Sequence, residues 1–165
     1  MSTGTKNYFE LLGLPERFSL DTHLLDENYK AFLRVFHPDR FAGEDALKQR
    51  LAQQMSTRIN DARDTLTDPL KRARYLCSLR GLDVNRSGLL STEFLSNQMD
   101  WFEKEESVLE SGSTDEKEAF CEKLKMHEKD VLDGLAKAFD AHDDQNSLRL
   151  SQELTYWERL LERLS

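Results

Sequence analysis

An apolar repeat of helical period that stops at a proline constrains the fold of this sequence more than any other feature. Between residues 24 and 36, apolar side chains recur at three- and four-residue steps, as on one face of an amphipathic helix. They are Leu24, Leu25, Tyr29, Phe32, Leu33 and Phe36. Asp21 is a suitable N-cap, and Pro38 disfavours helical angles at the residue before it, so we expect this helix to end near Phe36. The stretch PDRFAGED then forms a polar loop.

Helical patterns continue on both sides of this segment. NYFELLGL predicts a short helix that stops at Gly13. After the polar loop, a longer helix is expected to bury Leu47, Leu51, Met55, Ile59, Ala62 and Leu66. Asp68 caps a fourth helix, in which Pro69 takes the first position and Gly81 marks the end. Its inward-facing residues are expected to be Leu70, Ala73, Leu76 and Leu79.

The pattern changes beyond residues 82–90, which we interpret as a linker between a domain of residues 1–81 and one of residues 91–165. Three longer helices follow with short connections, which favours an antiparallel bundle. The first runs from about Thr92 to Glu110, and Ser113 with Glu116 forms a capping box that starts the second. Only 7 Gly and 3 Pro occur in 165 residues, and this composition is typical of an all-α fold. The bundle residues are Phe120, Leu124, Val131, Leu135 and Phe139 on the second helix, and Leu150, Leu154, Trp157, Leu161 and Leu164 on the third.

Charge and cysteine content exclude several classes of protein. The net charge of −8 argues against nucleic acid or an anionic membrane as the main partner. No apolar run reaches the length of a membrane span, and MSTGTKNYF lacks the apolar core of a signal peptide. Cys77 and Cys121 stand alone, so we expect no metal site, no disulfide scaffold and no cofactor. We also interpret Trp101 and Trp157 as core or edge residues of the bundle. His23, His127 and His142 are isolated in the sequence and are interpreted as surface residues.

The His-Pro-Asp tripeptide at residues 37–39 has two interpretations. It is either a helix C-terminus stopped by proline, with the histidine favourably placed against the helix dipole, or an exposed docking loop. Lys30 and Arg34 lie one turn apart on the helix face that leads toward the tripeptide, and they favour docking. A third possibility, an enzyme using His37 and Asp39 as an acid–base pair, is not favoured. Pro38 is expected to make the two side chains diverge, and no nucleophile or phosphate loop accompanies them.

The stretch YKAFLRVFHPDRF, residues 29–41, with a short helix before it and an antiparallel helix after it, resembles a J-domain. J-domains activate ATP hydrolysis by DnaK-type chaperones. Residues 59–81 and 94–106 are further similar to the HscB family of iron–sulfur co-chaperones, and the similarity extends over nearly the whole chain. It implies an N-terminal J-domain, which is an antiparallel helical hairpin with short flanking helices, plus a C-terminal three-helix antiparallel bundle. The implied chaperone-binding residues are His37, Pro38, Asp39, Lys30, Arg34 and Arg40.

The first bundle helix carries apolar and acidic residues on adjoining faces. At about 100° per residue, the core side is expected to hold Phe94, Leu95, Phe102 and Leu109, and the next stripe to hold Met99, Glu103, Glu106 and Glu110. This stripe is either peripheral core beside a solvated face or an apolar patch rimmed by carboxylates. The second arrangement would recognise a partner with an apolar spot beside Lys or Arg.

The HscB resemblance implies that this helix, with the last helix, binds the cluster scaffold IscU. The matching residues are Leu95, Ser96, Met99, Asp100, Glu103 and Tyr156. The resemblance also implies a function without enzymatic activity: the chain would deliver the scaffold to an HscA-type chaperone and stimulate its ATPase, which assists cluster transfer. The alternative is a J-protein that serves other clients. A bacterial cytoplasm is favoured over a mitochondrial matrix as its location.

Overall fold

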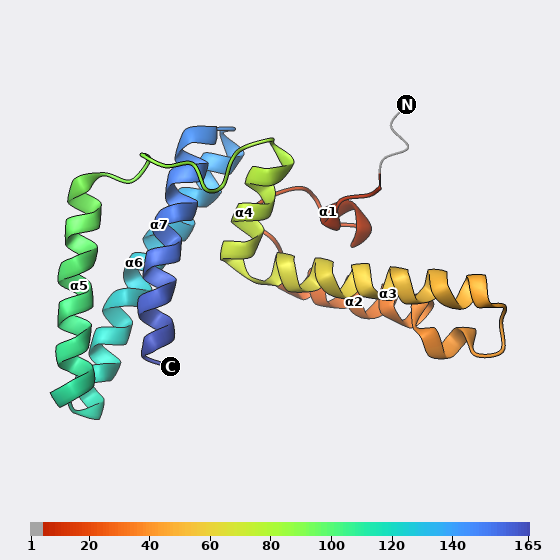
Figure 1. Cartoon of the computed structure of the whole chain (residues 1–165), viewed down its shortest axis with the longest axis horizontal. Coiled ribbons are helices and arrows are strands. Elements are labelled where there is room, and N and C mark those ends of the chain that lie inside the picture. The colour runs from red at the N-terminus through yellow and green to blue at the C-terminus, as the bar shows by residue number, and fades with distance from the viewer. Residues whose placement is uncertain (1–4) are drawn as a thin grey trace. The chain divides into compact units, whose positions relative to one another are not determined.

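The computed structural model describes residues 5–165, and all of its regular structure is helical (Figure 1). Its contacts divide the chain into two compact units, Met1–Tyr75 and Leu76–Ser165. The elements are α1 (Tyr8–Leu11), α2 (Thr22–Phe36), the 3-10 helix η1 (Pro38–Phe41), α3 (Ala46–Thr67), α4 (Pro69–Leu79), α5 (Thr92–Ser111), α6 (Thr114–Asp140) and α7 (Asp144–Arg163). The predicted all-α class is confirmed. The division falls within α4, and the domain boundaries expected at residues 81 and 91 stay a prediction.

In the first unit, α2 and α3 lie side by side as a helical hairpin (Figure 1). Asp21 caps α2 by accepting hydrogen bonds from two backbone amides, and the helix ends at Phe36, as predicted. The first half of the loop expected after it is instead the short helix η1, whereas residues 42–45 are non-helical as predicted. Proline suits the first position of a helix, and the backbone N–H of Asp39 donates to Nδ1 of His37, so this turn has its own cap.

The buried stripe of α3 is rotated by one residue at its start relative to the prediction. Leu47 and Leu51 were expected in the core but are 62% and 53% exposed, whereas Ala52 and Ser56 are buried. These small side chains face α2, and the Ser56 hydroxyl donates a 2.7 Å hydrogen bond to the carbonyl oxygen of Phe36. Further along, the predicted pattern holds. The fully buried large apolar residues of this unit are Phe9, Leu12, Ile59 and Leu66.

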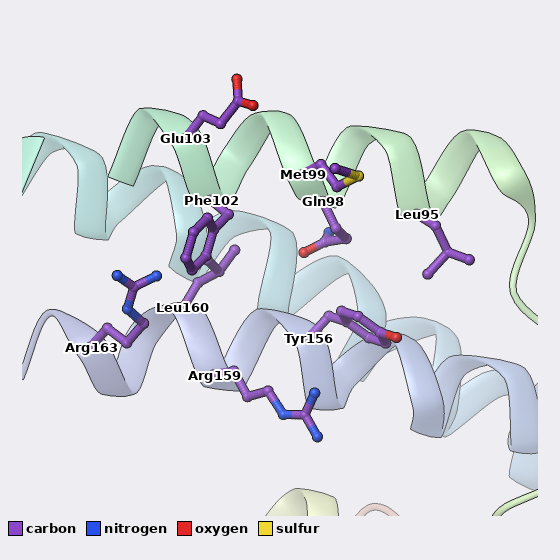
Figure 2. Close-up of a pocket in the computed structure, with 9 residues that line it drawn as sticks. All are labelled: Leu95, Gln98, Met99, Phe102, Glu103, Tyr156, Arg159, Leu160 and Arg163. Carbon is purple, nitrogen blue, oxygen red and sulfur yellow. The ribbon is translucent and has the colours of Figure 1, made fainter. Parts of the chain in front are cut away.

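The second unit contains α5, α6 and α7. α6 and α7 make the most extensive contact of the unit, and α5 makes fewer contacts with either. Ser113 caps α6 through the amide of Glu116, as the capping box predicted. Core residues from α6 and α7 include Phe120, Leu124, Leu135, Leu154 and Trp157. α5 and α7 also face each other across an open groove (Figure 2).

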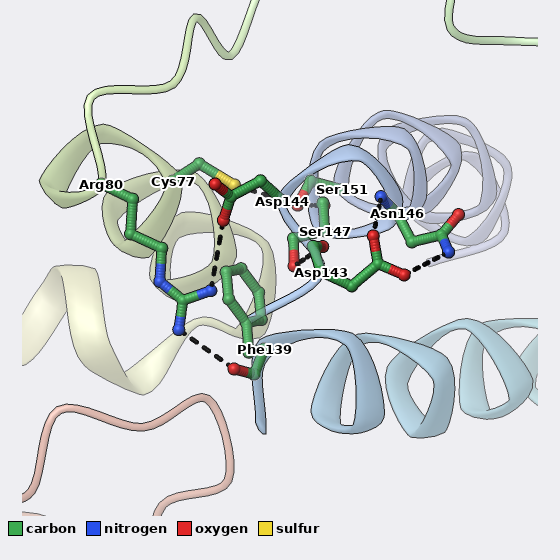
Figure 3. Close-up of polar contacts among 8 residues, drawn as sticks. All are labelled: Cys77, Arg80, Phe139, Asp143, Asp144, Asn146, Ser147 and Ser151. Atoms are coloured by element: carbon green, nitrogen blue, oxygen red, sulfur yellow. Dashed lines mark hydrogen bonds and ion pairs between the residues drawn. The ribbon is translucent and has the colours of Figure 1, made fainter. Parts of the chain in front are cut away.

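The end of α4 packs within the second unit through Cys77 and Arg80 (Figure 3). The Arg80 guanidinium donates a 3.0 Å hydrogen bond to the carbonyl oxygen of Phe139 and lies 3.7 Å from the carboxylate of Asp144. The buried Cys77 thiol lies 3.9 Å from the hydroxyl of Ser151. Leu79 was expected to face inward, but it is 38% exposed because Leu76 and Cys77 already occupy the packed face of this last turn.

None of the helices in residues 5–165 is long and apolar enough to cross a membrane. The expectation that the chain begins without a signal peptide rests partly on residues 1–4, which lie outside the described residues.

Candidate functional site

One end of the α2–α3 hairpin gathers the basic residues that the sequence singled out. Lys30, Leu33, Arg34, His37 and Arg40 line one shallow surface, which we call the hairpin-end surface. Arg40 reaches from η1 to donate a 3.1 Å hydrogen bond to the carbonyl oxygen of Arg34, and this contact holds the loop against the end of α2. Lys30 pairs with Asp26 at 2.9 Å, and this hydrogen bond lowers the pKa of the Asp26 carboxyl. Four of the six predicted chaperone-binding residues therefore lie together.

His37 and Asp39 lie beside each other at this surface. Nδ1 of His37 accepts a 3.2 Å hydrogen bond from the Asp39 backbone N–H and lies 3.5 Å from the Asp39 carboxylate. The expectation that Pro38 makes the two side chains diverge is therefore wrong, because the helical turn of η1 brings them back together. The Asp39 side chain is 91% exposed. The surface thus presents one freely accessible carboxylate beside a row of cations, which suits docking on a partner that carries both signs of charge.

α5 packs on the bundle with an unexpected face. Its buried residues are the polar Gln98 and Glu105, whereas Leu95 and Phe102, both expected in the core, are 38% and 48% exposed. The reason lies in Trp101, whose ring packs against Phe120 and Trp157 at centroid distances of 5.6 and 5.7 Å. This contact sets the rotation of α5 and turns the neighbouring apolar side chains outward.

Met99 is 67% exposed, so the interpretation of Met99 as peripheral core is excluded. Together with Leu95 and Phe102, it forms one wall of a groove of about 730 Å³, which we call the α5–α7 groove. Figure 2 shows Leu95 and Phe102 extending from α5 toward α7, where Tyr156 and Leu160 line the opposite wall, with Met99 between them on α5. The complete lining is Leu95, Gln98, Met99, Phe102, Glu103, Tyr156, Arg159, Leu160 and Arg163.

Of the six predicted scaffold-binding residues, Leu95, Met99, Glu103 and Tyr156 line the groove. Ser96 and Asp100 are exposed on α5 but do not belong to the lining. The prediction missed Gln98, Phe102, Arg159, Leu160 and Arg163. Helical spacing from Tyr156 could have found the last three, because positions three, four and seven residues further along share its face of α7.

The groove ends at an ion-pair cluster centred on Arg163. Its guanidinium lies 3.2 Å from the fully buried carboxylate of Glu105, also pairs with Glu106, and sits 4.3 Å from the centre of the Phe102 ring. Neither carboxylate oxygen of Glu105 accepts a hydrogen bond from any described residue. Burial therefore raises the pKa of the Glu105 carboxyl, and the charge of Arg163 opposes that rise.

Two further side chains in this region depart from expectation. The ring of His127 is not an isolated surface group. It is half-buried and stacks on the ring of Trp157 with a centroid distance of 4.4 Å. Because this ring contributes to the aromatic packing of the bundle, the prediction of a surface histidine is wrong. The side-chain nitrogen of Gln98 is buried and has no hydrogen-bond acceptor in the part of the chain that the structure describes.

A helical hairpin that ends in an exposed His-Pro-Asp turn beside a basic helix face, followed by a helical bundle, defines the class of J-domain co-chaperones. Residues 90–165 match the family model described as the HSCB C-terminal oligomerisation domain. The chain is 38% identical over 162 residues to a co-chaperone protein HscB homolog of Paraburkholderia phymatum, with 97% of this chain and 93% of that protein covered. A homolog from Burkholderia thailandensis is 38% identical over 156 residues, covering 93% and 89%.

Solved structures agree with these sequence relatives. Chaperone HscB from Vibrio cholerae matches with a TM-score of 0.88 and 34% identity, covering 96% of this chain and 95% of that one. The human co-chaperone protein HscB matches with a TM-score of 0.89 and 26% identity, covering 97% and 81%. The chain belongs to the HscB family of co-chaperones.

Proposed function

We propose that this protein is an adaptor between two partners of iron–sulfur cluster assembly. It binds an IscU-type scaffold through the α5–α7 groove and delivers it to an HscA/DnaK-type chaperone. It then stimulates that chaperone's ATPase through the hairpin-end surface and so assists cluster transfer. In this proposal ATP hydrolysis takes place on the chaperone, and the adaptor is not itself an enzyme. Its bacterial relatives favour the bacterial cytoplasm as its location.

The chaperone-binding half of the proposal is supported by the arrangement of charges at the hairpin end. Lys30, Arg34 and Arg40 present their cations on one side, and the carboxylate of Asp39 is almost fully exposed. Such complementary charges mainly govern orientation and association rate. Because His37 caps η1 through its ring nitrogen, the turn that carries Asp39 is held in one conformation before the partner arrives.

The observation that carries the scaffold-binding half is the exposure of Leu95, Met99 and Phe102 on one wall of a groove. Large apolar side chains that remain exposed together, rimmed by charges, mark an interaction surface. Tyr156 and Leu160 close the opposite wall, so an apolar side chain of a partner would be enclosed from two sides. Anchors of this kind supply most of the affinity of an interface.

Calorimetric titration of a purified IscU-type scaffold into this protein tests the assignment against the role of a J-protein for other clients. We expect saturable binding of the scaffold and no binding of an unrelated unfolded client at the same concentration. Equal binding of both would favour the general J-protein instead. A chain with Leu95→Ala and Met99→Ala serves as the control for the groove.

A further inference from the structure

The two cations on the α7 wall of the groove differ in what they already bind. The Arg163 guanidinium is occupied by two carboxylates, those of Glu105 and Glu106. Arg159 is exposed and stands one turn earlier, with its guanidinium 5.7 Å from the centre of the Tyr156 ring. No carboxylate of the described residues lies within ion-pair distance of it. Arg159 therefore contacts the Tyr156 ring on the groove wall, and its positive charge is not neutralised by a carboxylate of the described residues.

The opposite wall carries the opposite charge. Glu103 is exposed on α5, and no cation of residues 5–165 pairs with it. Figure 2 shows Glu103 and Arg159 at opposite edges of the groove, with the apolar side chains of Met99 and Phe102 between them. The groove thus has an electrostatic direction across its width, negative along α5 and positive along α7. An occupant with a single sign of charge would match only one edge.

We propose that Arg159 binds a carboxylate of the scaffold and thereby fixes the direction in which the scaffold segment lies in the groove. This inference rests on the proposed function and adds the chemistry of the occupant. The segment carries an apolar side chain between a basic residue, which meets Glu103, and an acidic residue, which meets Arg159. The planar guanidinium of Arg159 lies over the Tyr156 ring and can still make a bidentate contact with a carboxylate, which a lysine cannot make in the same way.

The test compares three single variants by calorimetric titration of the same metal-free IscU-type scaffold. Arg159→Glu reverses the charge in the groove, and Arg159→Lys keeps the charge but removes the fork of donors. Lys123→Glu reverses an exposed charge on α6 that pairs with no carboxylate of residues 5–165. We expect about a tenfold loss of affinity for Arg159→Glu, a smaller loss for Arg159→Lys and no loss for Lys123→Glu. The loss for Arg159→Glu should shrink as salt is raised, because screening weakens exposed charge pairs.

A charge swap then identifies the partner group. Each Asp or Glu of the scaffold is replaced in turn by Lys, and one such variant should bind weakly to the unsubstituted chain but recover its affinity with Arg159→Glu. If Arg159→Glu binds the original scaffold as tightly as the unsubstituted chain does, or if no swap restores affinity, the inference is overturned while the scaffold-binding function stands. If the unsubstituted chain fails to bind the scaffold, both are overturned.

A second copy of this chain is the competing occupant, and sedimentation equilibrium of the chain alone tests it. We expect the same mass distribution for the unsubstituted chain and for Arg159→Glu. Self-association that Arg159→Glu abolishes would show that the groove binds another copy, and it would overturn the assignment of Arg159 to the scaffold.

Discussion

Glu105 and Arg163 form a 3.2 Å ion pair in which the carboxylate has no exposure to solvent and the guanidinium is about one-third exposed. The pair joins α5 to the last turn of α7 beside the groove. Removing a carboxylate from water disfavours its charged form, and one partially exposed guanidinium compensates only part of that cost. Consequently the folded protein holds the Glu105 proton more tightly than the unfolded chain does.

This difference predicts how stability depends on pH. A carboxyl whose pKa is raised on folding contributes stability that is fully present below its ordinary pKa of 4.5 and is lost as pH rises through the folded value. Glu105→Gln removes that loss. We therefore expect the stability of the variant relative to the unsubstituted chain to increase as pH rises above 4.5, in urea unfolding measured at several pH values. Glu103→Gln makes the same substitution at an exposed position on α5 and serves as the control. A pH-independent difference for Glu105→Gln would contradict the account.

The buried amide of Gln98 gives a second prediction about stability. Its side-chain nitrogen has no acceptor among the described residues, and a buried unsatisfied donor costs about 1–3 kcal/mol. Gln98→Met keeps the length of the side chain and removes the donor, so the free energy of unfolding should rise by about 1 kcal/mol. Chemical denaturation checks this, with Asn97→Met at an exposed neighbouring position as the control. A less stable Gln98→Met would show that the amide is satisfied.

The hairpin-end surface predicts a loss of activity without a loss of stability. His37→Gln or Asp39→Asn should abolish stimulation of the chaperone's ATPase, because the first removes the ring nitrogen that caps the turn and the second removes the carboxylate that the turn presents. Both side chains are well exposed, so the melting temperature should change little, with stability shifting by about 0.5 kcal/mol or less. His23→Gln makes the same substitution at an exposed site on α2 and should retain full stimulation. Full stimulation by Asp39→Asn would exclude this surface as the docking site.

The groove predicts a loss of binding without a loss of stability. Leu95→Ala with Met99→Ala should weaken scaffold binding about tenfold or more, because interface anchors cost roughly 2 kcal/mol or above. Melting should change little, since both side chains are substantially exposed in the free protein. Met126→Ala is the matched control: this methionine is 69% exposed on α6 and does not line the groove. A large drop in melting temperature for the double variant, with unchanged binding, would make Leu95 and Met99 structural residues.

Local signals in the sequence predicted the helices well. These signals depend on residues that are close together in the chain. Examples are the caps at Asp21 and Ser113, the end of α2 at Phe36, and the basic row that runs from Lys30 to the His-Pro-Asp turn. Whether this row and the groove bind the proposed partners stays a prediction. η1 was missed because its cap uses a histidine ring nitrogen, which is outside the usual set of capping groups.

The rotation of α5 could not be predicted in the same way. Helical periodicity on a single segment places Leu95 and Phe102 on the same apolar side as Phe94, yet Phe94 packs against rings of α7 whereas the other two are exposed. The face that packs is chosen by the fit of Trp101 between rings from α6 and α7. That choice depends on residues far away in the sequence. The same holds for Arg163, whose pairing with Glu105 only becomes visible once α5 and α7 lie together.

ATPase stimulation of an HscA/DnaK-type chaperone, measured with and without the IscU-type scaffold, tests the adaptor role most directly. We expect the scaffold to increase stimulation by the full chain, because the adaptor holds its client at high effective concentration beside the chaperone. The Leu95→Ala and Met99→Ala chain should keep the stimulation seen without scaffold and lose the increase. If the scaffold produces no increase with the unsubstituted chain, or the same increase with the double variant, the adaptor account is contradicted.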